Sequence, residues 1–148
     1  MAKNMMVENA ILSDTAKKMV AGILDAADAI TAFGNTIPIS YLRLVPHQEA
    51  PTNICWGERN RSVVIRVPLG WIGAGHMVQH ANPNDCSGYP KVESKQTVEY
   101  RVADGSANPY LTVAGLIVAA LDGLRRSDAL QLAEKLYIDV NIFKPEFK

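Results

Sequence analysis

The sequence is poor in the residue types that mark several special classes of protein. Only 2 of its 148 residues are cysteines, Cys55 and Cys86, and they form no CxxC pair. That number is too small for the disulfide framework of a secreted domain, so we expect both to be reduced thiols. The 15 basic residues balance the 15 acidic ones. No net charge attracts nucleic acid or an anionic membrane, so any charge-based function has to come from a local cluster.

Long hydrophobic runs are missing as well. The longest, Val113 to Leu121, is well short of the roughly 20 apolar residues that cross a bilayer, and we interpret it as a buried core helix. Met1 to Asn9 lack the basic segment and apolar run of a secretory signal, so we expect a cytoplasmic protein. With 48% hydrophobic and 20% charged residues, the length fits one globular domain, residues 1–148.

The hydrophobic pattern predicts helices at both ends of the chain. Apolar residues recur every three or four positions from Leu12 to Phe33, which is typical of an amphipathic helix. Ser13 is placed to cap its start, and Gly34-Asn35 to end it with a left-handed residue. After Asn108, a helix from Pro109 to about Arg125 is apolar nearly all round, which predicts packing on a sheet and another element at once.

Three short segments between the helices have the composition of β-strands. Thr52 to Trp56 and Ser62 to Pro68 are joined by a polar turn, which predicts a hairpin. From Thr97 to Val102 apolar and polar residues alternate, so one face should be core and the other should carry charge. A shorter helix is expected from Asp128 to about Tyr137. The order of elements shows no βαβ alternation, which predicts an α+β fold with a mainly antiparallel sheet.

Two segments are expected to be irregular. Thr36 to Pro51 contains three prolines and is interpreted as a loop, or a loop plus an edge strand. Leu69 to Ser94 is rich in Gly, Asn, Pro and Asp, and such a long insert is more often functional or mobile than structural. Within it, His76 and His80 have helical spacing, but the glycines and prolines around them favour a polar loop over a metal site.

From Arg43 to Arg66 the sequence contains arginines and no lysine. The arginines of this stretch are Arg43, Arg59, Arg61 and Arg66, and Arg101 follows later beside Glu99. The guanidinium group is a planar fork of donors that matches carboxylate and phosphate groups. One interpretation is therefore an anion-binding surface that contains one carboxylate. The other is a sheet face of paired, solvated ions.

Several short motifs occur in order along the chain. They are Ser40-Tyr41-Leu42-Arg43-Leu44-Val45-Pro46, Glu49-Ala50-Pro51, Arg59-Asn60-Arg61-Ser62, Ile65-Arg66-Val67-Pro68, Glu99-Tyr100-Arg101 and Ser106-Ala107-Asn108-Pro109-Tyr110-Leu111. From about Leu12 to Arg125 the chain resembles the C-terminal half of the glutamine synthetase catalytic domain. This resemblance implies an ATP-dependent ligase with Mg²⁺ or Mn²⁺ as cofactor, acting on glutamate and ammonia or an amine, and assembled as a homo-oligomer.

The resemblance also implies roles for individual residues in binding the amino acid and the metal. Arg43 and Arg101 match the arginines that hold the carboxylates of glutamate. Glu99 matches a metal-ligand glutamate. Glu49 matches the glutamate of a flap that closes over the site, helps to deprotonate ammonium and shields the acyl phosphate from water.

Two further arginines match residues that contact the nucleotide. The resemblance implies that Arg61 and Arg66 contact the ATP phosphates and the transferred phosphoryl group, with Arg61 taking part in catalysis. Phosphorylation of a carboxylate gathers negative charge in one place, so the site has to supply fixed positive charge. One arginine acting on such a transition state is worth about 10³–10⁵ in rate.

The resemblance is partial. The other metal ligands of the family, its Asn-Gly loop, a histidine and the small N-terminal domain have no counterpart here, and Glu99 alone is a poor anchor for magnesium. Thr97 stands where the family often has a nucleotide-contacting arginine, and the Leu69 to Ser94 insert is longer than the common pattern. We therefore expect little or no activity from the chain alone, and possible restoration by a chain that carries the missing half. The alternative is a non-catalytic remnant or an assembly module. Either way, we expect exposed apolar surface that drives association.

Overall fold

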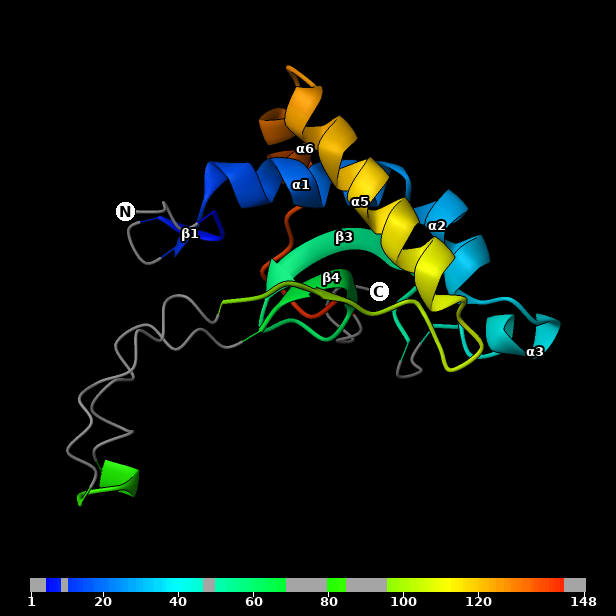
Figure 1. Cartoon of the computed structure of the whole chain (residues 1–148), viewed down its shortest axis with the longest axis horizontal. Helices are drawn as coiled ribbons and strands as arrows, with labels where there is room; N and C mark the ends of the chain where they lie inside the picture. Colours follow the sequence, from blue (N-terminus) through cyan, green and yellow to red (C-terminus); the bar gives the residue numbers. More distant parts are fainter. Residues whose placement is uncertain (1–4, 9–10, 47–49, 69–79, 85–95, 143–148) are drawn as a thin grey trace.

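The computed structural model describes residues 5–8, 11–46, 50–68, 80–84 and 96–142. Figure 1 shows a layer of helices lying over a small sheet. The helices are α1 (Asp14–Asp25), α2 (Ala27–Gly34), α3 (Pro38–Tyr41), α5 (Pro109–Arg125) and α6 (Ala129–Lys135). The strands β3 (Asn53–Glu58), β4 (Val63–Val67) and β5 (Glu99–Tyr100) form one sheet, and β1 (Val7–Glu8) pairs with β2 (Ile11–Leu12) in another. The α+β class is confirmed.

The first predicted helix is present but interrupted. Ser13 caps α1 as predicted, because its side chain accepts a hydrogen bond from the backbone N–H of Ala16 at 3.1 Å. At Ala26 the backbone leaves helical geometry, and α2 starts after it. The predicted left-handed ending is wrong: α2 ends at Gly34, which has no left-handed φ, and Asn35 after it has a φ of −138°. The break allows α1 and α2 to pack separately against α5.

The predicted hairpin is also wrong, because β3 and β4 run parallel. Arg59 has a left-handed φ of 55°, and the side chain of Asn60 accepts hydrogen bonds from the N–H and hydroxyl of Ser62. The same amide donates to the carbonyl of Val140 at 2.8 Å. This turn carries the chain back to the start of β3 instead of reversing it. Of the three strand pairs described, β1–β2 and β4–β5 are antiparallel, so the larger sheet is mixed.

The segment from Thr36 to Pro51 was expected to be a loop or an edge strand. Over its described part it contains the short helix α3, which Pro38 starts. Proline suits the first turn of a helix because the N–H that it lacks would have no partner there. The third predicted strand is confirmed as β5, with Val98, Tyr100 and Val102 packed into the core. Leu69 to Ser94 lies outside the described residues except for 80–84, and so do His76 and Cys86. Cys55 is a buried free thiol, as predicted.

Helix α5 is less buried than its composition predicts. Asn108 caps it by accepting from the N–H of Leu111, and its contacts are made mainly with α1 and α2. Only four of its residues are buried, and all four are small: Thr112, Ala119, Ala120 and Gly123. The interpretation of Val113 to Leu121 as a buried core helix is therefore wrong. The expected exposed apolar surface is present, and Val118 is 67% exposed. Among the described residues, no helix is long and apolar enough to span a membrane.

Candidate active site

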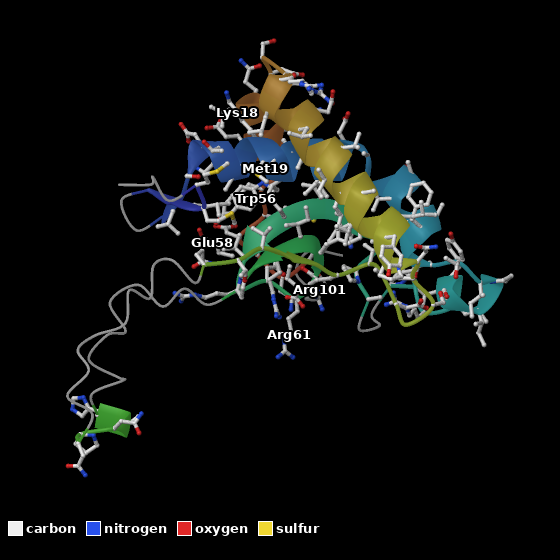
Figure 2. All side chains as sticks on the ribbon, in the orientation of Figure 1. Lys18, Met19, Trp56, Glu58, Arg61 and Arg101 are labelled. Carbon is white, nitrogen blue, oxygen red and sulfur yellow. The ribbon has the colours of Figure 1, made fainter. Side chains whose placement is uncertain are left out.

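The sheet has one face that the helices leave open. Helices α1, α2 and α5 lie on one side of β3, β4 and β5 (Figure 1). Figure 2 shows the side chains of Arg61 and Arg101 on the opposite side, pointing away from the helices. Alternation along β5 explains this arrangement, because Glu99 and Arg101 share one face while Tyr100 and Val102 share the other. Tyr100 and Val102 pack into the core, so the charged pair faces outward.

Glu99 lies between two arginines on this open face. Glu99 and Arg66 are direct cross-strand partners in the antiparallel β4–β5 pair, and Arg66 Nη2 is 2.6 Å from Glu99 Oε2. Arg101 Nε is 3.9 Å from Glu99 Oε1. Sequence and sheet register together therefore bring Arg66, Glu99 and Arg101 into one cluster. The convergence that the anion-binding interpretation required is present for these three residues.

Arg101 also connects this cluster to the turn that carries Arg61. Its side chain is 10% exposed, and Nη1 donates hydrogen bonds to the backbone carbonyls of Arg61 and Val63. The guanidinium of Arg101 thus holds the turn before β4 against β5. The side chain of Arg61 itself is exposed and extends from the open face (Figure 2). The side chain of Arg61 is consequently exposed to a ligand, whereas Arg101 already uses Nη1 and Nε in contacts within the protein.

Arg43 reaches the same end of the sheet from a different direction. Its Nη2 donates to the side-chain oxygen of Asn35 at 3.1 Å and to the carbonyl of Val102, the residue after Arg101. Its Nε is 3.7 Å from Asp104 Oδ2. Arg43 therefore lies beside the end of β5, but its described contacts hold the loop and do not include the Arg66–Glu99–Arg101 cluster.

Asp104 is a partner to which the sequence assigned no role. Its Oδ1 accepts from the hydroxyl of Ser106 at 2.6 Å and from the backbone N–H of Ser106 at 2.8 Å. These hydrogen bonds, one from Ser40 and the nearby charge of Arg43 lower the pKa of Asp104 to about 2. The carboxylate is therefore charged over the physiological range. The Asp-x-Ser spacing, typical of a side-chain turn, was the signal in the sequence.

The cluster fits a metal ion only in part. Glu99 Oε2 is buried and lies 2.6 Å from Arg66 Nη2, so its charge is paired within the protein. A carboxylate oxygen has more than one lone pair, and such oxygens are the ligands that divalent cations prefer. Within the described ranges, however, no group of three or more His, Cys, Asp or Glu side chains could hold a metal. Glu99 fits as a single ligand. Glu49 lies outside the described residues, so its predicted role stays a prediction.

Comparisons with known proteins show which family the chain resembles. The family model described as glutamine synthetase, catalytic domain, matches residues 1–147. The glutamine synthetase of Thermococcus kodakarensis is 38% identical over 133 residues, which is 90% of this chain and 24% of that protein. For the Frankia alni glutamine synthetase the identity is 42%, over 77% of this chain and 20% of that protein. A cryo-electron microscopy structure of Plasmodium falciparum glutamine synthetase has a TM-score of 0.58 and 30% identity. The match covers 78% of this chain and 19% of the Plasmodium falciparum chain.

These similarities extend over nearly the whole chain but over a limited part of each relative. The chain spans about a quarter or less of the length of the proteins it matches. Two of the motifs that resembled the family in the sequence contribute the residues that meet on the open sheet face, Arg66 from β4 and Glu99 and Arg101 from β5 and its end. The chain belongs to the glutamine synthetase catalytic-domain family.

Proposed function

We propose that the chain is part of the catalytic centre of an ATP-dependent ligase that joins glutamate to ammonia or an amine. The Arg66–Glu99–Arg101 cluster on the open sheet face is the observation that supports this proposal most directly. In this cluster the carboxylate that the family resemblance assigns to the metal lies between two arginines, with Glu99 Oε2 2.6 Å from Arg66 Nη2.

The reaction proceeds in two steps. The γ-carboxylate of glutamate attacks the γ-phosphorus of ATP, the bond to the bridging oxygen breaks, and ADP leaves. Ammonia then attacks the carbonyl carbon of γ-glutamyl phosphate, phosphate leaves, and one proton is lost to give the amide. Both steps move negative charge, so fixed guanidinium groups lower the barrier by electrostatic stabilisation.

Each arginine has a part that suits its position. Arg61 is exposed, which suits contact with the ATP phosphates and the transferred phosphoryl group. Arg66 lies on β4 and is paired with Glu99 in the cluster. Arg101 is rigidly held, which suits orientation of a glutamate carboxylate. Arg43 is the arginine that the resemblance assigns to the other carboxylate, and its Nε lies 3.7 Å from Asp104 Oδ2 at the end of β5.

A divalent cation, Mg²⁺ or Mn²⁺, would neutralise phosphate charge, and Glu99 would supply one of its ligands. Magnesium prefers oxygen ligands from carboxylate side chains, water and phosphate. Any further carboxylate ligands would have to come from a part of the catalytic domain that the described residues do not include. Glu49 would close over the centre, accept a proton from ammonium and exclude water from the acyl phosphate. Thr97 provides no positive charge at its position, so the nucleotide contacts would depend on Arg61 and Arg66.

The chain alone should show little or no ligase activity. The described residues supply one metal ligand, and the chain covers about a quarter of its relatives. The test mixes the chain with a chain carrying the preceding part of a related catalytic domain and measures phosphate release dependent on ATP, glutamate and ammonia. We expect activity only in the mixture, and Arg66→Ala or Glu99→Ala should abolish it. Activity of the chain alone would contradict the need for a partner.

A non-catalytic remnant or assembly module is the second candidate. The engagement of Arg43 and Arg101 with backbone carbonyls favours it, because these guanidinium groups then have a structural role without any substrate. Under this alternative the mixture stays inactive, and neither substitution in the cluster affects anything but stability. We propose a homo-oligomer in either case, on the basis of the exposed apolar face of α5. The cytoplasmic location expected from the sequence stays a proposal.

A further inference from the structure

A pocket of about 260 Å³ lies on the side of the sheet that carries the helices. Its lining comes from β2, α1, β3, α6 and the segment just after α6: Leu12, Lys17, Trp56, Glu58, Glu134 and Tyr137. Figure 2 shows Trp56 and Glu58 on the α1 side of β3, and Arg61 and Arg101 below the sheet. The volume is below the roughly 300–1,000 Å³ of sites for drug-sized molecules, so it suits a small ligand.

Trp56 provides a rigid aromatic wall. It is 4% exposed, and its indole Nε1 donates to the carbonyl of Ala133 at 2.7 Å. Its backbone N–H donates to Leu136, and its carbonyl accepts from Ile138. The ring of Tyr137 lies against it, with ring centroids 4.8 Å apart and planes tilted by 57°. The wall is therefore fixed before any ligand arrives, which lowers the entropic cost of binding.

The rim of the pocket is negatively charged. Glu58 and Glu134 are exposed, and no ion pair among the described residues joins either carboxylate to a basic side chain. Lys17 is the opposing charge, but its Nζ is 4.0 Å from Asp14, outside the lining, which partly neutralises it. Burial, together with the charges of Glu58 and Asp139, raises the pKa of Tyr137.

We propose that this pocket binds a small organic cation, an alkylammonium or guanidinium group on a short apolar body. The apolar body would pack on Trp56 and Leu12, and the cation would lie between the two carboxylates and over the ring of Tyr137. A cation above an aromatic face is attracted by the ring quadrupole, and a nearby carboxylate adds a charge-assisted hydrogen bond. This inference does not depend on the proposed ligase activity, because it uses none of the residues of the open face.

The experiment is calorimetric titration of the full chain with three probes that share a phenyl body. They are 2-phenylethylammonium, the neutral 2-phenylethanol and the anionic 3-phenylpropanoate. We expect the ammonium probe to bind at least about fivefold more tightly than the alcohol, and the carboxylate to bind most weakly. Raising the salt concentration should weaken binding of the ammonium probe and leave the alcohol unaffected.

Matched variants identify the site. Glu58→Gln and Glu134→Gln keep the side-chain shape and should each weaken the ammonium probe about two- to fivefold, whereas Lys17→Met should strengthen it slightly. Asp122→Asn removes an exposed carboxylate from α5, outside the lining, and should change nothing. Circular dichroism confirms that each variant is folded. Equal affinity for the ammonium and the alcohol, preference for the anion, or no binding at millimolar probe would overturn the proposal.

Discussion

Gly22 of α1 and Gly123 of α5 meet where the two helices cross. A β-carbon on Gly22 would lie 2.1 Å from the carbonyl oxygen of Ala119 and 2.6 Å from the nitrogen of Gly123. A β-carbon on Gly123 would lie 2.1 Å from the carbonyl oxygen of Lys18. The obstructing atoms belong to backbone on both sides, so no rotamer change relieves the clash. Two glycines therefore set how closely these helices approach.

Gly22→Ala should destabilise the protein, by roughly 1–3 kcal/mol, because the helices have to separate. Chemical denaturation measures the change in the free energy of unfolding. Gly115→Ala on α5 is the control, since its β-carbon faces α2 and would meet the ring of Phe33 at an ordinary 3.4 Å. That variant should be neutral or more stable by about 0.5–1 kcal/mol, because alanine is the better helix former. Equal effects of the two substitutions would show that the close crossing is not formed.

Sequence and structure differ most where tertiary contacts override local pattern. Hydrophobic spacing and capping residues were enough to place α1 and α5, because Ser13 and Asn108 form their caps within three residues. The direction of β4 was not predictable from its composition. It depends on the amide of Asn60 bonding to Val140, which is 80 positions away in the chain. No short-range pattern carries that contact.

In the candidate site, too, local pattern predicts some features, and others depend on contacts between distant residues. Glu99 and Arg101 could be assigned to one face from alternation, and β4–β5 register supplied Arg66. The sequence could not show that Arg101 is bound to the carbonyl of Arg61, or that Arg43 is held by Asn35 and Val102. These contacts decide which guanidinium is available to a ligand. The sequence therefore predicts which charged residues share the sheet face, but not which of them are held by contacts within the protein.

Asp104 should make the stability of the protein depend on pH in the acid range. Its pKa in the folded chain is about 2, below the ordinary 3.8, because Ser106 and Ser40 donate to the carboxylate and Arg43 is nearby. A carboxyl with a lowered pKa stabilises the folded state above its unfolded pKa, and this contribution is lost as pH falls from about 5 to 2. Melting temperatures of the unsubstituted protein and Asp104→Asn should therefore differ at pH 6 and converge near pH 2. A difference that is constant with pH would exclude this linkage.

The exposed apolar face of α5 should drive association. Tyr110, Ile117 and Val118 are 86%, 54% and 67% exposed, which is unusual for a helix of a monomeric protein. Val118→Lys should shift the protein toward smaller species, because a buried unpaired ammonium opposes contact between apolar surfaces. Gln131→Lys places the same charge on exposed α6 and is the control. Analytical ultracentrifugation compares both variants with the unsubstituted protein. If Val118→Lys and the unsubstituted protein sediment identically at all concentrations, the α5 face does not form the contact between chains.

Substitutions of Arg61 and Arg101 should differ in their effects on activity and on stability. Arg61→Ala removes an exposed side chain, so the free energy of unfolding should change by less than about 0.5 kcal/mol. In the reconstituted mixture the same variant should lose about 10³-fold or more in kcat if the guanidinium acts on the phosphoryl group. Arg101→Ala deletes the donor to the carbonyls of Arg61 and Val63, and should lower both activity and stability. Denaturation and phosphate-release assays on the two variants make the comparison. An active Arg61→Ala mixture would remove Arg61 from the reaction and leave the open face with a structural role only.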